Sequence, residues 1–217
     1  MKRAVLLTGH FAHQHRRPSF LWISDALQQM GWHVTLITVG YSWLSRLRGD
    51  KRLTTLPAPP RIGTHQVKDR LTTVFGYAPI HPVRSGSATV DHMLRPLHQL
   101  FPAYWAPRLK PHLAHADLVL IESGAPIMLA ALARRLAPRT QLIYRVNDDI
   151  QLLNPPAFLP ILESNMAKFC DRISTPSPHL AQRFAQHPNV TLDPMGIPRD
   201  SLANSPLNPY TQRAKFE

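Results

Sequence analysis

The chain has 217 residues, 44% of them apolar, which is enough to bury a core and excludes a globally disordered protein. Only 18% are charged, yet Lys and Arg outnumber Asp and Glu by 25 to 13, which gives a formal net charge of +12. The single cysteine, Cys170, excludes an intrachain disulfide, and no run of about 18 apolar residues is present that could cross a membrane. We therefore expect a cytoplasmic protein, either soluble or peripheral to the membrane.

The positive charge is concentrated in the first half of the sequence. Residues 1–115 contain 15 Lys and Arg against 4 Asp and Glu, a net charge of +11, whereas residues 116–217 contain 10 against 9, a net charge of +1. Such segregation indicates a polyanionic partner. Nucleic acid, an anionic membrane surface and a phosphorylated substrate are all compatible with it.

The first 39 residues follow the order strand, loop, helix, strand. Residues 4–8 and 33–39 are short, largely apolar runs typical of buried parallel strands. Between them, Pro18 suits the first turn of a helix with apolar residues at helical spacing, and Gly31 ends it. This opening predicts a Rossmann-like, doubly wound, mostly parallel α/β sheet.

The remaining chain is irregular first and alternating later. Residues 40–62 are basic and contain proline, and we expect no regular structure there; residues 88–115 are helical segments interrupted by four prolines. The other predicted elements are strands at 72–77, 117–121, 141–146, 172–175 and 190–192, and helices at 126–136, 156–169 and 179–186. We expect one domain over residues 1–192, followed by a linker or truncated tail over residues 193–217.

Two aspartates follow the predicted strand at 141–146. Ligands of open parallel sheets bind beyond the carboxyl ends of the strands, where Asn147, Asp148 and Asp149 lie in this sequence. A carboxylate in that position can accept a proton from a substrate hydroxyl. The alternative is that Asp148 or Asp149 caps a following helix or turn, and spacing alone leaves both open.

Glu122, Ser123 and Gly124 follow the predicted strand at 117–121. Gly124 lets a ligand approach the backbone, or it only makes a tight turn. A helix that begins here presents free N–H groups to an anion. A binding loop and a structural turn are both compatible with these residues.

The loop after the first predicted strand contains three histidines, His10, His13 and His15. A metal site needs further ligands such as a carboxylate or thiolate, so we expect cleft-lining or solvated histidines and no metal. Arg16 and Arg17, close to the start of the next helix, are better suited to contact a phosphate.

Basic and apolar residues alternate in two places. The first comprises Trp43, Arg46, Arg48, Lys51 and Arg52, together with Leu44 and Leu47. Such a mixture fits a membrane interface or a lipid-linked diphosphate. A second apolar stripe at residues 93–105 is flanked by basic residues, and there packing in a helical core is an equally good explanation.

Several common motifs are absent from the sequence. It contains no Gly-x-Gly-x-x-Gly, Walker A loop, Cys-x-x-Cys pair or Gly-x-Ser-x-Gly elbow. Their absence argues against dehydrogenases, ATPases, zinc proteins and serine hydrolases.

Three stretches resemble the GumK family of xanthan-type glucuronosyltransferases. They are Arg16-Arg17 with Phe20 and residues 23–27, then residues 41–53, and then residues 121–124 with residues 142–145 and Asp148. The stretches occur in the family's order and span most of residues 5–200. Each is weak alone, and the three together are fairly specific.

The resemblance implies the N-terminal, acceptor-binding half of a two-domain GT-B enzyme at the inner face of a bacterial plasma membrane. Such an enzyme transfers glucuronate with inversion from UDP-glucuronate to a polyprenyl-diphosphate-linked oligosaccharide in exopolysaccharide synthesis, without a cofactor or metal. Asp148 matches the family's catalytic base, whereas Asp149 stands where the family has Gly. The other residues expected at the acceptor cleft are His10, Arg16, Arg17, Glu122, Ser123, Gly124, Arg145 and Asp149.

Family members hold the UDP moiety mostly with a C-terminal domain. We expect that domain after this chain or in a separate subunit, and we therefore expect the chain alone to be inactive. A non-catalytic module that recruits the lipid-linked acceptor for a separate transferase is the alternative. A nucleic-acid-binding protein is a third hypothesis, but no recognition motif is present, and we expect no nucleic-acid partner.

Overall fold

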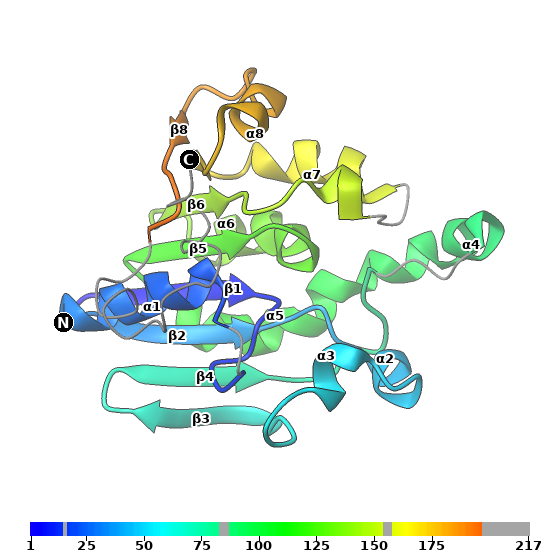
Figure 1. Cartoon of the computed structure of the whole chain (residues 1–217), viewed down its shortest axis with the longest axis horizontal. Helices are drawn as coiled ribbons and strands as arrows, with labels where there is room; N and C mark the ends of the chain where they lie inside the picture. The colour runs from blue at the N-terminus through cyan, green and yellow to red at the C-terminus, as the bar shows by residue number, and fades with distance from the viewer. Residues whose placement is uncertain (15–16, 83–86, 154–157, 197–217) are drawn as a thin grey trace, which may run out of the picture.

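The structure is a computed structural model that describes residues 1–14, 17–82, 87–153 and 158–196. These residues contain an eight-stranded sheet with the strand order β3-β4-β2-β1-β5-β6-β7-β8 (Figure 1). The strands are β1 (Arg3–Thr8), β2 (His33–Thr38), β3 (Gly63–Lys68), β4 (Leu71–Phe75), β5 (Leu118–Glu122), β6 (Gln141–Arg145), β7 (Arg172–Thr175) and β8 (Val190–Leu192). Only the β3–β4 pair is antiparallel. The predicted Rossmann-like, mostly parallel fold is confirmed.

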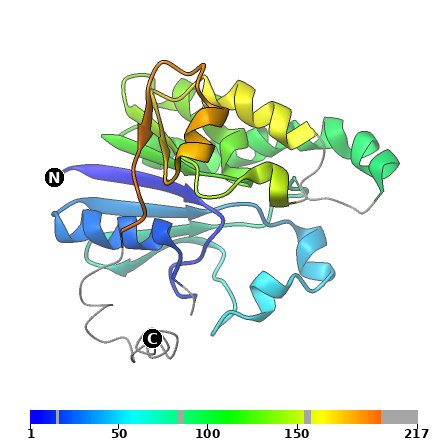
Figure 2. The same ribbon diagram turned by 45° about the horizontal axis from the view of Figure 1, so that its top comes forward.

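Helices cover both faces of the sheet (Figure 2). One face packs against α1 (Ser19–Gln29), and the other against α5 (Leu100–Leu113), α6 (Ala130–Leu136) and α7 (Phe158–Ala167). Alternate residues of β1 serve the two cores: Leu6 packs with α1, and Leu7 packs in the core on the other face. The remaining helices are α2 (Trp43–Leu47), α3 (Lys51–Thr54), α4 (Ala88–His98), α8 (Pro178–Arg183) and the 3-10 helices η1 (Ala125–Leu129) and η2 (Ile150–Leu153).

The expectation of no regular structure at residues 40–62 is wrong, because two short capped helices lie there. α2 begins with a reciprocal pair in which the Ser42 hydroxyl accepts from the Ser45 backbone N–H and the Ser45 hydroxyl accepts from the Ser42 N–H. Asp50 caps α3 by accepting from the backbone N–H of Arg52. Both helices lie beyond the carboxyl ends of the central strands (Figure 1).

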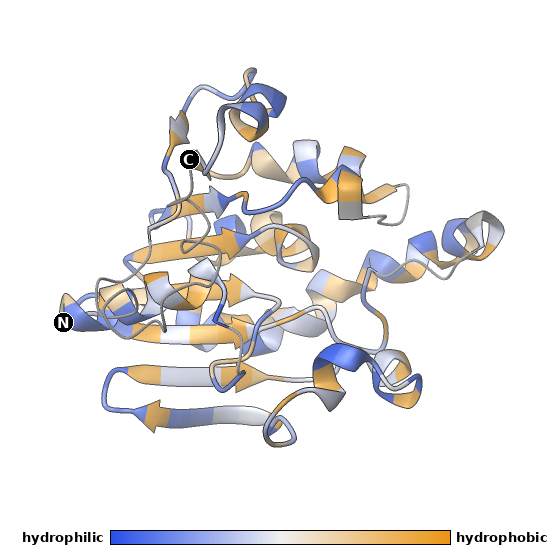
Figure 3. Ribbon diagram, viewed as in Figure 1, coloured by the Kyte–Doolittle hydropathy of each residue, from blue (hydrophilic) through white to orange (hydrophobic). Residues whose placement is uncertain are grey.

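Strand β3 was not predicted, since it carries no apolar run. It is an edge strand with mostly exposed, polar residues, and it pairs only with β4. Figure 3 shows the contrast between this strand and the apolar central strands.

The prolines at residues 102–111 do not interrupt α5. Pro107 and Pro111 lie on its exposed side, where the carbonyl oxygens that lose a partner can bond water. The opposite side places Phe101, Trp105 and Leu109 in the core, four residues apart. Burial of these large side chains, about 1.5–3 kcal/mol each, offsets the loss of about 3 kcal/mol at each proline.

The strand order reverses between β1 and β5. The chain proceeds from β1 through β2 to β4 on one side, and from β5 through β6 to β8 on the other. Loops leaving neighbouring strands in opposite directions open a crevice at this switch point, which is where open α/β sheets bind ligands. Gly40 lies beside it with φ +87°, a conformation that strains other residues, and a β-carbon there would lie 3.1 Å from that of Ala125.

Candidate functional site at the switch point of the sheet

Glu122 joins the two strands that flank the switch point. Its carboxylate is 4% exposed at the end of β5 and accepts hydrogen bonds from the Thr8 hydroxyl at 2.5 Å and the Gly9 backbone N–H at 3.2 Å. The side-chain amide of Asn147, after β6, also donates to it at 3.0 Å. Three strand ends are thus held together by one buried carboxylate, and Glu122 has an organising role in the crevice.

His10 completes this Glu122 cluster. Its Nε2 atom lies 3.4 Å from Glu122, and its side chain is 38% exposed, so the ring reaches the surface of the crevice. Burial alone would lower the pKa of His10, but the hydrogen bond and the charge of Glu122 outweigh it, and the pKa is raised above 6.5. His10 can therefore present a positive charge to an anionic ligand.

Asp148 lies on the surface next to this cluster. Its carboxylate is exposed and makes no hydrogen bond or ion pair with any residue that the structure describes. The backbone beside it is fixed, because the Asn147 N–H donates to the Ser123 hydroxyl at 3.3 Å, and the Ser19 hydroxyl lies 3.5 Å from the Asn147 side-chain oxygen. Asp148 thus has a carboxylate without a partner among the described residues, on a loop with a fixed backbone, which suits a general base.

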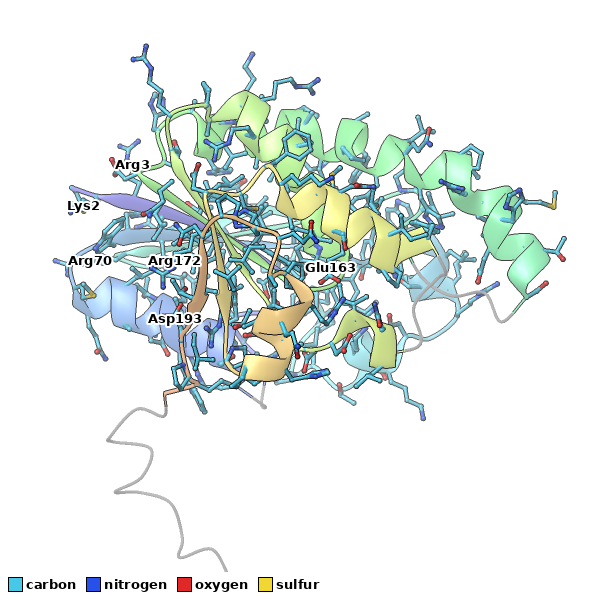
Figure 4. All side chains as sticks on the ribbon, turned by 90° about the horizontal axis from the view of Figure 1, so that it is seen from above. Lys2, Arg3, Arg70, Glu163, Arg172 and Asp193 are labelled. Carbon is cyan, nitrogen blue, oxygen red and sulfur yellow. The ribbon has the colours of Figure 1, made fainter. Side chains whose placement is uncertain are left out.

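Asp149, in contrast, is used by the fold. Its carboxylate lies 2.8 Å from the guanidinium of Arg183 and 3.6 Å from His179, and it accepts from the backbone N–H of Gln151. Arg183 also contacts the fully buried Glu163 at 2.7 Å (Glu163 is labelled in Figure 4). Asp149 therefore has the structural role that we considered for either aspartate, and the sequence alone could not tell which of the two has it.

Ser123 and Gly124 form a turn after β5. Gly124 has φ +95° and ψ −145°, a conformation that other residues rarely adopt. The next element is the five-residue 3-10 helix η1, rather than the α-helix predicted to start here. The turn holds the loop of Asp148 through the Ser123 hydroxyl, which is its structural role.

Arg145 lies in a buried network that adjoins the Glu122 cluster, because its Nε–H donates to the Asn147 side-chain oxygen at 3.3 Å. Its guanidinium donates to the Ser174 hydroxyl at 2.8 Å and to the Asp193 carbonyl oxygen at 2.7 Å, and burial lowers its pKa. The Asp193 carboxylate pairs with Arg172 on β7 (Figure 4). Arg145 therefore anchors the chain where it leaves β8, and the contacts of the domain extend to residue 193.

The structure describes some of the residues in the loop after β1 that were predicted to line the cleft or contact a phosphate. Arg17 is ion-paired with Asp25 of α1, and His13 lies 3.3 Å from the carbonyl oxygen of Ala58. Arg16 and His15 lie outside the described residues. Among the residues that are described, no group of three His, Cys, Asp or Glu side chains could hold a metal ion.

Of the predicted membrane-facing residues, Trp43 and Arg46 lie on α2, Arg48 caps its carboxyl end, and Lys51 and Arg52 lie on α3. Trp43 is 47% exposed and stacks with Arg46, whose guanidinium carbon is 5.3 Å from the ring, while Arg48 and Lys51 are exposed. Arg52 is different, because it pairs with Asp50 at 2.7 Å and covers the Tyr41 ring.

The stripe at residues 93–105 divides into two parts. Phe101 and Trp105 belong to the core, as the packing alternative predicted, whereas Met93, Leu97 and Leu100 are exposed. α4, which carries Met93 and Leu97, projects from the body on the same side as α2 (Figure 1). In the described part of the chain, no helix has both the length and the apolar character needed to span a bilayer.

The positive charge of the first half does not collect on one face. Lys2, Arg3 and Arg70 lie together at the amino-terminal edge of the sheet (Figure 4). Arg46, Arg48 and Lys51 lie beyond the opposite edge. Only this second group is near the switch point.

The fold and the position of the site define a Rossmann-like domain of the GT-B type, the N-terminal half of that fold. A structure described as trehalose-6-phosphate from E. coli bound with UDP-2-fluoro glucose aligns with a TM-score of 0.61 and 13% identity over 99% of this chain and 54% of its own. Arabidopsis thaliana UGT89C1 complexed with UDP-L-rhamnose aligns with a TM-score of 0.51 and 16% identity over 97% of this chain and 53% of its own. At these identities the likeness establishes the fold alone.

Sequence comparison gives the family. The chain belongs to the family described as glucuronosyltransferase GumK, N-terminal domain, whose model matches residues 6–176. It is also 24% identical over 186 residues to the UDP-glucuronate:glycolipid 2-beta-glucuronosyltransferase of Xanthomonas campestris pv. campestris. The match covers 86% of this chain and 46% of that relative, so the chain spans about half the length of the relative.

Thr8 and Asn147 also belong to the site, although the sequence predicted no role for either side chain. Both lie at strand ends, next to residues that were selected. That position was the available signal, because polar side chains at the carboxyl ends of parallel strands face the crevice.

Proposed function

We propose that this chain is the acceptor-binding half of an inverting glycosyltransferase. The reaction is transfer of glucuronate from UDP-glucuronate to a polyprenyl-diphosphate-linked oligosaccharide in exopolysaccharide synthesis. The family match and the glucuronosyltransferase of Xanthomonas support this choice of reaction. The single observation that carries it is the exposed, unpaired carboxylate of Asp148 beside the switch point, where a family base is expected.

The proposed step is a direct displacement. Asp148 accepts the proton of the acceptor hydroxyl, and that oxygen forms a bond to the anomeric carbon of glucuronate. The bond from this carbon to the diphosphate breaks, and UDP leaves with the electron pair. The donor nucleotide is bound mostly by a C-terminal domain, and the step uses no metal or cofactor.

His10 has a supporting part in this proposal. Its ring is half-exposed and is held beside Glu122, which favours the protonated form. A cation at this position attracts the negative groups of donor and acceptor and favours their approach. Glu122 acts through Thr8 and Asn147, as a positioning residue.

We place the protein at the inner face of the plasma membrane, as a peripheral protein. Exposed apolar side chains beside exposed cations support this: Trp43 and Leu47 on α2, at 47% and 83% exposure, adjoin Arg48 and Lys51. Apolar groups of this kind enter the headgroup region of a bilayer, and each nearby cation adds about 1 kcal/mol on an anionic leaflet.

The test uses a chimera in which this chain replaces the N-terminal half of the Xanthomonas relative. Transfer of radiolabelled glucuronate to a lipid-linked acceptor is measured, and Asp148→Asn is expected to lower it about 100- to 10,000-fold. The matched control is Asp69→Asn, since Asp69 is also exposed but lies in the β3–β4 turn at the opposite edge. Equal activity of the Asp148→Asn chimera and its parent would rule out the proposed base.

A membrane-recruitment module is the second candidate, and the exposed Trp43 and Leu47 favour it as much as they favour the enzyme. In that case the Asp148→Asn chimera still binds vesicles and the parent chimera transfers no sugar. Transfer by the parent chimera that depends on Asp148 excludes this candidate.

A further inference from the structure

A separate cavity lies on the α1 face of the sheet. Its volume is about 510 Å3, and it is enclosed by α1, the loop after β1, residues 57–61 and the β3–β4 hairpin. Its floor is apolar and consists of the buried side chains of Phe11, Leu21, Leu71 and Phe75. Neither Glu122 nor Asp148 lines it, and its size falls in the range of about 300–1,000 Å3 typical of ligand sites.

One wall of this α1-face cavity is a proline segment. Residues 57–60 read Pro-Ala-Pro-Pro, and three prolines restrict the backbone, so the wall is formed before a ligand arrives. The His13 ring, 3.3 Å from the Ala58 carbonyl oxygen, connects this wall to the loop after β1. The proline rings of this wall and the phenyl rings of the floor offer contacts to an apolar chain rather than hydrogen bonds to a sugar.

The cavity also has an excess of positive charge at its margin. Among the described residues that line it, Asp25 is the only carboxylate, and it is already paired with Arg17. Arg61 and Lys68 line it as well, and neither is ion-paired with a residue that the structure describes. Cations without counter-ions beside an apolar floor select a ligand with an apolar chain and an anionic group.

The two cations lie at opposite ends of the cavity. β3 runs antiparallel to β4, with Gly63 opposite Phe75 and Lys68 opposite Leu71. Arg61, which precedes β3, is therefore at the carboxyl edge of the sheet, and Lys68 is at the amino edge. His13 lies at the carboxyl edge too, because it follows β1.

We propose that the α1-face cavity binds the apolar chain of a lipid diphosphate, with the diphosphate next to Arg61 and His13. This deepens the proposed function and rests on it, because a lipid-linked acceptor carries both groups. The loop after β1 connects the two places: Phe11 contacts the cavity, while the adjacent His10 contacts Glu122. A headgroup held at Arg61 is thus at the same edge of the sheet as Asp148.

The test measures binding by the 217-residue chain with no sugar donor present. Calorimetric titrations compare farnesyl diphosphate, geranyl diphosphate and inorganic diphosphate. Since each buried methylene contributes up to about fourfold in affinity, we expect farnesyl diphosphate to bind at least about 10-fold more tightly than geranyl diphosphate and more than about 100-fold more tightly than inorganic diphosphate. Equal affinities for farnesyl and inorganic diphosphate would overturn the proposal.

Two variants locate the site. Arg61→Gln should weaken the binding of farnesyl diphosphate about 10-fold, whereas Lys168→Gln, exposed on the opposite face after α7, should leave the affinity within about twofold. A loss in Lys168→Gln equal to that in Arg61→Gln would show unspecific charge binding and reject the site.

Thr73→Trp fills the cavity from β4 and should abolish binding, with circular dichroism and the melting temperature confirming that the variant is folded. Unchanged affinity in a folded Thr73→Trp variant also rejects the site. Because no transfer step is involved, these results are independent of the chimera test of Asp148. Failure of the cavity proposal can therefore be told apart from failure of the proposed function.

Discussion

The carboxylate of Asp149 lies 2.8 Å from the guanidinium of Arg183, whereas that of the preceding Asp148 is exposed and contacts none of the described residues. Adjacent residues point in different directions where the chain leaves a strand. Asp149 reaches α8 and η2 and fixes the loop, which leaves Asp148 on a defined backbone with its proton-accepting atoms free. The second carboxylate in this sequence thus supports the loop, and Asp148 keeps the catalytic role in our proposal.

Exchange of each aspartate for asparagine should separate these roles. We expect Asp149→Asn to lower the free energy of unfolding by about 1–3 kcal/mol, because Arg183, only 15% exposed, loses one of its two carboxylate partners. Asp148→Asn should change it by less than about 0.5 kcal/mol, since it removes no contact. Urea denaturation followed by circular dichroism measures both values.

The conservative variant Asp149→Glu serves as a control, because it keeps the charge near Arg183 and should recover part of the stability. Equal destabilisation by Asp148→Asn and Asp149→Asn would contradict the assignment of separate roles.

The pair of Glu122 and His10 should be visible in a titration. The raised pKa of His10 depends on the hydrogen bond and charge of Glu122, which outweigh burial. Glu122→Gln should therefore lower the pKa of His10, because burial and the nearby Arg52 then act with little opposition. Chemical shifts of the His10 imidazole protons over pH 5–9 measure the change.

The sign of the linked stability follows from the same shift. Because folding raises the pKa of His10, the pair contributes its full stabilisation below about pH 6.5 and loses it as the pH rises through the folded value. In the His10→Gln variant, this part of the pH dependence of unfolding should be absent. A His10 pKa that is the same with and without the Glu122 carboxylate would refute the coupling.

The central strands were predictable because they are buried on both faces. β1 and β2, for example, are short apolar runs that end at Gly9 or close to Gly40, and their predicted limits lie within a residue of the observed ones. β3 was not predictable in this way, because an edge strand has few apolar residues. α5 was also misread, since the positions of Pro107 and Pro111 on its exposed side become visible only in the packed helix.

The site was predictable in position and not in detail. Residues after parallel strands share one edge, so Glu122 and Asp148 could be selected from the sequence. That Glu122 turns toward Thr8 depends on β1 and β5 being neighbours, which is a property of strand order. The ion pair of Asp149 with Arg183, 34 residues later, likewise becomes visible only in the tertiary structure.

Cys170 should be unreactive in the folded chain. It is 5% exposed, and burial raises its pKa to about 12, so almost none of it is thiolate at pH 8. We expect no reaction with Ellman's reagent under native conditions and one thiol per chain in 6 M urea. As the protein has a single cysteine, the readout has no background, and rapid native labelling would contradict its burial in the core.

Membrane binding should depend on the exposed apolar residues of α2. Replacement of Trp43 and Leu47 by serine removes two side chains that are 47% and 83% exposed, so we expect little change in the free energy of unfolding. Affinity for vesicles rich in phosphatidylglycerol should fall at least about 10-fold. Flotation at increasing salt measures the binding, and the wild-type chain should dissociate partly as charge attraction is screened. The matched control replaces Met30 and Leu192, which are 72% and 51% exposed but lie away from α2. If the Trp43 and Leu47 variant floats as well as the wild-type chain, or if the control variant loses as much vesicle binding, α2 is not the membrane-contacting surface.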